Sequence, residues 1–71
     1  MDANILVSVA KHPKLDISDV SKKLSQAGMN IVDVLKLSRI VTGTVDEKKI
    51  PVLREVPGVA SVDLDVEFTA H

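Results

Sequence analysis

The chain has 71 residues, the size of one small domain, and folding at that size buries only about 60% of the surface that the unfolded chain exposes. Val, Leu, Ile and Ala dominate its 45% hydrophobic content, with a single aromatic residue, so the composition favours a thin aliphatic core and argues against a deep catalytic cavity. Nine basic and ten acidic residues leave a net charge of −1, which excludes a broad field that would attract nucleic acid or an anionic membrane.

The residues that most enzymes and metal sites need are missing from the sequence. It contains no cysteine, and therefore no disulfide, thiolate nucleophile or cysteine-based metal site. His12 and His71 lie at opposite ends of the chain, and no Ser–His–Asp or paired-carboxylate arrangement is compelling. We expect no enzymatic activity, no metal and no cofactor. The first ten residues have an acid at position 2 and too short an apolar run for a leader or a membrane span, which predicts a cytoplasmic protein.

The first part of the chain predicts a strand followed by a helix. Residues 4–10, NILVSVA, alternate apolar and polar side chains, as a short strand does. Asp16 or Ser18 can cap the helix that follows, and Gly28 supplies the left-handed residue that ends it. The inward side of this helix is formed by apolar residues at helical spacing: Ile17, Val20, Leu24 and Ala27.

The middle of the chain predicts a strand pair and a second helix. Residues 30–45 are rich in β-branched side chains and form two runs with a tight connection at residues 38–39. Gly43 in the second run indicates close packing by a helix or a neighbouring backbone. Asp46 can cap the second helix, and Pro51 makes that helix short or late in starting, because an interior proline removes a hydrogen bond. Its inward residues are Ile50, Leu53 and Val56.

A final strand follows once Pro57 and Gly58 have ended the second helix. Its apolar face is formed by Val62, Leu64, Val66 and Phe68. Its acidic face is formed by Asp63, Asp65 and Glu67. The order βαββαβ predicts a single α+β, ferredoxin-like domain over residues 1–71, with a four-stranded antiparallel sheet and two helices on one face. The last strand lies at an edge of that sheet, and the uncovered face and this edge remain available to a partner.

Part of the sequence resembles the subtilisin propeptide, the domain shared with free-standing proteinase inhibitors of the I9 type. The resemblance runs from Gly28, through a strand pair that ends in TGTV, to the segment DEKKIPVLREVPGVASVDLD. It implies a βαββαβ domain that lays its open sheet face on two surface helices of a protease. It also implies a C-terminal tail, residues 66–71, that runs through the substrate cleft of that enzyme.

The same resemblance implies roles for individual residues. Asp63 and Asp65 match acids that cap the two protease helices, where a carboxylate satisfies free amides and meets the positive end of the helix dipole. His71 would occupy the primary specificity pocket and Phe68 the pocket three residues upstream, unless Phe68 completes the core stripe instead. The complete set expected to bind the protease is Asp63, Asp65, Glu67, Phe68, Thr69, Ala70 and His71.

Two functions are therefore compatible with the sequence. The first is a stand-alone inhibitor, or folding chaperone, of a subtilisin-type serine protease, monomeric when free and without a nucleic-acid or membrane partner. The second rests on HPKLDISDVSKKLSQAGMNIVDV and LREVPGVASV, which are similar to ACT regulatory domains. That resemblance implies a dimerising module that binds a small ligand such as an amino acid beneath the first loop. Lys14 departs from this pattern, because ACT domains usually have a glycine there that lets the backbone approach the ligand.

Overall fold

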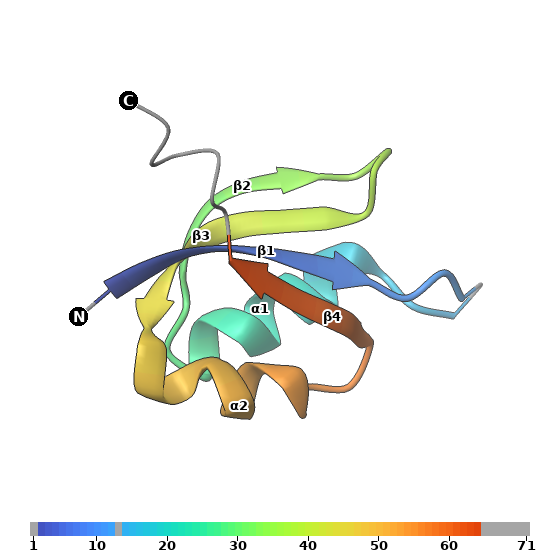
Figure 1. Ribbon diagram of the computed structural model, residues 1–71. Helices are drawn as coiled ribbons and strands as arrows, with labels where there is room; N and C mark the ends of the chain where they lie inside the picture. Colours follow the sequence, from blue (N-terminus) through green and yellow to red (C-terminus); the bar gives the residue numbers. More distant parts are fainter. Residues whose placement is uncertain (1, 13, 65–71) are drawn as a thin grey trace.

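The structure is a computed structural model that describes residues 2–12 and 14–64. Its elements are β1 (Asp2–Val9), α1 (Ile17–Gln26), β2 (Asn30–Leu35), β3 (Ile40–Asp46), a 3₁₀ turn (Glu47–Lys49), α2 (Ile50–Arg54) and β4 (Val59–Leu64). Within these residues the four strands form one antiparallel sheet in the order β2-β3-β1-β4, and both helices lie on the same side of it (Figure 1). The predicted α+β fold is confirmed, with β4 at an edge.

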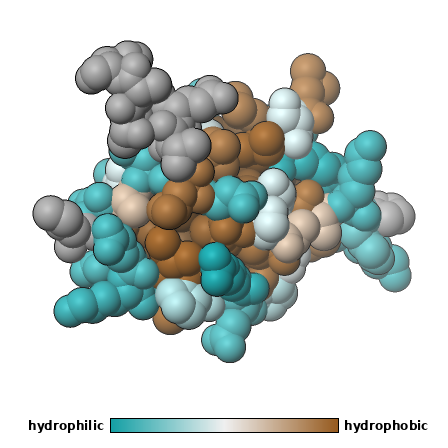
Figure 2. All heavy atoms as spheres, viewed as in Figure 1, coloured by the Kyte–Doolittle hydropathy of each residue, from teal (hydrophilic) through white to brown (hydrophobic). Residues whose placement is uncertain are grey.

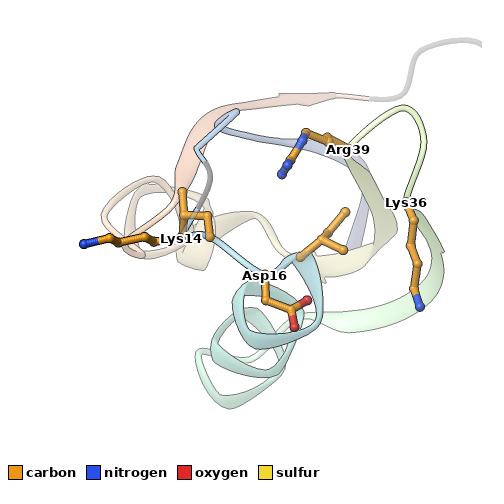
Figure 3. A pocket seen from close by; sticks show the side chains of 6 residues that line it. Lys14, Asp16, Lys36 and Arg39 are labelled. Carbon is orange, nitrogen blue, oxygen red and sulfur yellow. The ribbon is translucent and has the colours of Figure 1, made fainter.

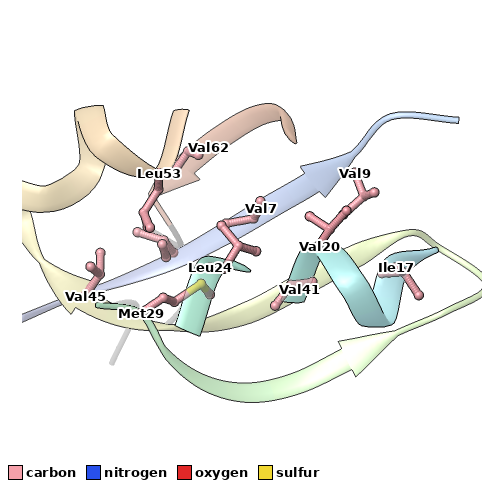
Figure 4. Close-up of a cluster of buried hydrophobic side chains, with 11 residues drawn as sticks. Val7, Val9, Ile17, Val20, Leu24, Met29, Val41, Val45, Leu53 and Val62 are labelled. Atoms are coloured by element: carbon pink, nitrogen blue, oxygen red, sulfur yellow. The ribbon is translucent and has the colours of Figure 1, made fainter. Parts of the chain in front are cut away.

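The core is an aliphatic layer between the sheet and the helices. On β1 the alternate residues Ile5, Val7 and Val9 are 1%, 0% and 5% exposed, because every second side chain of a strand points to the same face. Buried side chains from β3, β4 and both helices complete the cluster (Figure 4), and the partly buried Ile31 and Val34 of β2 pack against it. Met29, which follows α1 and is 3% exposed, belongs to this core, although helical spacing did not predict it.

Helix α1 begins and ends through local hydrogen bonding. The Asp16 carboxylate accepts a hydrogen bond from the Ser18 amide at 2.9 Å, so Asp16 is the N-cap and Ser18 lies inside the helix. At the other end Gly28 adopts a φ of 112°, the left-handed conformation that glycine tolerates best. The predicted inward side is confirmed for Ile17, Val20 and Leu24, which are buried.

The β2–β3 hairpin packs more closely than an ordinary strand pair. A Cβ atom on Gly43 would meet the backbone oxygen of Asn30 and the side chain of Met29, which confirms the predicted approach of a neighbouring backbone. The connection is longer than predicted: residues 36–39 form the turn, and Arg39 carries a φ of 55°. Extra turn residues carry their side chains beyond the end of the sheet.

Helix α2 is short, as Pro51 predicted. The Asp46 carboxylate accepts from the Lys48 amide at 3.1 Å and starts a 3₁₀ turn, after which the α-helix runs for five residues with Pro51 in its first turn. Leu53 is its only buried side chain.

Strand β4 departs from the predicted apolar stripe. Val62 is 6% exposed, but Leu64, two residues further along the same face, is 57% exposed. Leu64 was predicted to be part of the core face, and its exposure corrects that expectation. Val66 and Phe68 lie outside the described residues.

Candidate protein-binding surface

The face of the sheet opposite the helices is built from three rows of residues that cross the strands, and we call it the open face. The strand register defines the middle row as Asp33, Thr42, Leu6 and Asp63. The row toward the β2–β3 turn is Leu35, Ile40, Ser8 and Ser61. The row on the other side contains Asn30, Thr44 and Asn4.

The middle row ends in a carboxylate at each edge of the sheet. Asp33 lies on edge strand β2 and Asp63 on edge strand β4, and both are exposed. Three strand spacings separate them, or about 14 Å. Between them the row is uncharged, and Leu35 adds an apolar side chain that is 41% exposed. The open face therefore has an uncharged centre between two separated acids.

Of the residues predicted to bind the protease, Asp63 lies within the described part of the chain. It is exposed near the end of β4, and Ser61 Oγ donates to its carboxylate at 3.4 Å. Its position on the open face, opposite Leu6, agrees with the predicted acidic face of this strand. The other predicted binding residues lie outside the described residues: Asp65, Glu67, Phe68, Thr69, Ala70 and His71.

Asp33 is a candidate residue that the sequence did not predict. The register of β2 against β3 shifts between Ile31 and Asp33, so Val32 is the extra residue of a bulge and is 72% exposed. In a regular strand Val32 would lie on the same face as Asn30 and pair with Thr42. Because of the bulge, Asp33 pairs with Thr42 instead. The run NIVDVL contains no glycine or proline that would have revealed the shift.

The two edge strands differ in how freely they can pair with another chain. On β2 the Val34 amide donates to the Asp33 carboxylate at 2.9 Å, and the bulge distorts the strand beside it. Both features protect a sheet edge against pairing. On β1, the Val9 amide donates to the Arg39 carbonyl at 2.8 Å, so odd-numbered β1 residues bond β3 and even-numbered ones bond β4. The alternation leaves the backbone groups of Val62 and Leu64 facing the free edge of β4.

A second feature lies at the loop between β1 and α1. A hollow of about 380 Å³ is lined by Lys14, Leu15, Asp16, Ile17, Lys36 and Arg39 (Figure 3). The Lys14 amide donates to His12 Nδ1 at 3.1 Å, and the Lys14 side chain extends away from the other labelled side chains. Arg39 Nη1 donates to the Ala10 carbonyl at 3.5 Å, while the Asp16 carboxylate is engaged in capping α1.

The described residues carry neither a metal-binding cluster nor a helix that could cross a membrane. Between residues 2–12 and 14–64 there is no group of three or more His, Asp or Glu side chains that could hold a metal ion. In the described part of the chain, neither helix has the length and apolar character that crossing a membrane requires. No family model matches the chain, and no curated protein is significantly similar to it.

Proposed function

We propose that this chain inhibits a subtilisin-type serine protease as a separate molecule, by docking the open face on the enzyme and passing residues 66–71 through its substrate cleft. The observation that supports this most is the middle row of the open face, where Asp33 and Asp63 stand at opposite edges of an uncharged strip that no helix covers. The same binding mode would allow the chain to assist folding of the enzyme.

The spacing of the two acids suits a pair of helices on the enzyme. Packed helices have axes about 8–10 Å apart, so the axes of two of them lie within a strip about 14 Å wide. A carboxylate at each edge then meets the free amides at a helix N-terminus and the positive end of its dipole. Each such contact contributes about 0.5–2 kcal/mol, by analogy with caps inside proteins. Hydroxyl and aliphatic groups between the acids, such as Thr42 and Leu6, provide the contact area.

The exposure of Leu64 supports the second half of the proposal, in which residues 66–71 bind in the cleft by main-chain pairing with alternate side chains in pockets. Leu64 is 57% exposed, so the core stripe within the described residues ends at Val62. This supports the interpretation of Phe68 as an anchor for the enzyme rather than as a continuation of the core.

The decisive experiment titrates the purified chain against a broad-specificity subtilisin and follows cleavage of a chromogenic peptide. We expect inhibition by the full chain and its loss when Thr69 to His71 are removed. Replacing Asp63 and Asp65 together with Ala should weaken inhibition without lowering the melting temperature, because exposed acids contribute little to stability. Glu55→Ala removes one acid at the exposed end of α2 and is the matched control that should inhibit as well as the original chain.

Two results would overturn the proposal. One is full protease activity in a large molar excess of the chain. The other is unfolding of the Asp63→Ala, Asp65→Ala variant, since these acids would then serve the domain itself. Phe68→Ala separates the two roles of that side chain: lost inhibition with unchanged melting identifies an anchor, whereas a large fall in melting temperature identifies a core residue.

A second candidate function is binding of a small zwitterion such as an amino acid. The observation that favours it is the hollow beside the first loop, which carries Arg39 on one wall and Asp16 on another. The protected edge of β2 speaks against side-by-side pairing of two copies through that strand. A thermal-shift screen with the common amino acids, combined with sedimentation, tests this function, because a ligand that binds only the native state raises the melting temperature.

A further inference from the structure

The tip of the β2–β3 hairpin carries an apolar side chain that the described residues leave uncovered. Leu37 is 102% exposed and Leu35 is 41% exposed. The hairpin tip projects beyond the body of the molecule, and Figure 2 shows hydrophobic atoms at its outermost point. The inner side of the turn adds a hollow of about 450 Å³, lined by Val34, Leu35, Lys36, Leu37 and Ser38. A fully exposed leucine adds nothing to packing in the free protein.

Four cations from two segments lie at the same end of the molecule as this tip. Lys36 and Arg39 belong to the turn, and Lys11 and Lys14 belong to the loop after β1. The loop and the turn meet because the Val9 amide donates to the Arg39 carbonyl at 2.8 Å and Arg39 Nη1 reaches the Ala10 carbonyl at 3.5 Å. Lys14, Lys36 and Arg39 also line one hollow.

Within this loop and turn the acid is Asp16, which lines the same hollow as Lys14, Lys36 and Arg39; Asp19 and Asp33 lie further along on α1 and β2. The Asp16 carboxylate is held by the Ser18 amide. This end of the molecule is therefore positively charged, in a chain whose net charge is −1.

We propose that this end of the molecule binds the surface of an anionic lipid bilayer. We name it the tip surface and define it as Lys11, Lys14, Lys36, Leu37 and Arg39. Leu37 would enter the boundary between headgroups and acyl chains, and the four cations would meet lipid phosphates and carboxylates, which attract basic side chains near the membrane. The contact is peripheral, since it uses side chains at a hairpin tip and no spanning segment.

The shape of the tip surface favours a bilayer over other anionic partners. A protein partner would need a pocket for a leucine that projects from a convex turn, whereas a fluid lipid surface needs none. Nucleic acid would engage the cations through its phosphates and leave Leu37 without a role. A lipid surface uses both the projecting leucine and the cations of the neighbouring loop and turn. The proposal departs from the expectation drawn from net charge, because the fold gathers cations that are separated in sequence.

Lipid binding at this end leaves the proposed protease-binding residue accessible. β4 begins beside Val9 near the hairpin end and runs to Leu64 beside Ile5, so Asp63 lies at the far end of the strand from the tip surface. The two proposals therefore use different parts of the molecule and stand or fall separately.

The test is co-sedimentation of the full chain with phosphatidylcholine vesicles, prepared with and without phosphatidylserine. We expect binding only to the anionic vesicles, with an affinity that falls as salt is added. Leu37→Ser should weaken binding on the order of tenfold, because the buried leucine is lost. Val52→Ser is the matched control, since Val52 is 49% exposed on α2, away from the tip surface.

Charge is tested separately by two double variants that change the net charge equally. Lys14→Glu with Lys36→Glu reverses two cations of the tip surface and should abolish binding. Lys22→Glu with Lys48→Glu reverses two exposed cations outside the tip surface, and this variant should retain most of the vesicle binding. Circular dichroism spectra check that all variants remain folded, and protease inhibition without vesicles should be unchanged in Leu37→Ser.

Several outcomes would overturn the proposal. These are absence of binding to anionic vesicles, equal binding to neutral ones, or equal losses in the tip and control variants. Binding of the chain to polyglutamate or duplex DNA that is as strong as binding to vesicles, and that Leu37→Ser leaves intact, would assign the cations to an anionic polymer instead.

Discussion

Neighbouring residues of β1 divide between two environments. Ile5 and Val7 are at most 1% exposed under the helices, whereas Leu6, which lies between them, is only half-buried on the open face. The side chains have similar size and apolar character, so the difference comes from the helical layer that covers one face and not the other. In a small domain with about 5–15 kcal/mol of stability at most, the covered face supplies most of that stability. The open face is left to contact a partner.

Truncating one side chain on each face gives the strongest test of the difference between the two faces. Leu53 is 0% exposed at the centre of the covered side, and Leu53→Ala should cost about 2–5 kcal/mol through lost burial and a cavity. Leu6→Ala on the open face should cost at most about 1 kcal/mol, because less apolar surface is lost. Urea unfolding followed by circular dichroism measures both. Equal losses in the two variants would contradict the division of roles between the faces.

Adjacent residues on β3 allow a second comparison of the two faces. A side chain on Gly43 would press against the Asn30 carbonyl, so Gly43→Ala should cost about 1–3 kcal/mol through forced backbone movement. Thr42→Val, one residue earlier and on the open face, should change stability by about 0.5 kcal/mol or less. The same unfolding experiment applies. A neutral Gly43→Ala would mean that β2 can move away from β3 freely.

Substitutions at the N-terminus of α1 test how much the helix cap contributes to the stability of the helical layer over the covered face. Asp16→Ala removes the acceptor of the Ser18 amide and should cost about 0.5–2 kcal/mol. Asp19→Ala removes the same charge from the first turn without removing the cap, and should cost about 0.3–1 kcal/mol. Asp16→Ser, which keeps an acceptor, should restore most of the difference in melting temperature. Failure of that rescue would show that charge, not capping, matters at this position.

The smallest effect is expected at the edges of the open face. Asp33→Ala frees the Val34 amide at an exposed edge, where water can replace the carboxylate, so stability should change by about 0.5 kcal/mol or less. Removing this protection should instead promote pairing through β2, which sedimentation at increasing protein concentration can measure. A chain that unfolds on this change would show that Asp33 supports the sheet.

Much of the fold followed from rules that act over a few neighbouring residues. The spacing of the apolar residues in α1, its cap at Asp16, its end at Gly28 and the shortening of α2 by Pro51 all depend on local hydrogen bonds and dihedral angles. The sequence also predicted the acidic face that contains Asp63. These features could be read in advance because a helix cap or a strand alternation involves residues close along the chain.

Other features depended on how distant segments meet. The bulge that brings Asp33 to the open face arises from the register of β2 against β3, and Leu64 is exposed although it shares a strand face with the buried Val62. Met29 joins the core, and the cations at Lys14 and Arg39 share one hollow, only because segments separated in sequence are packed together. Strand register, the packing of helices on the sheet and the clustering of like charges depend on how segments assemble. The sequence pattern of one segment therefore does not predict them.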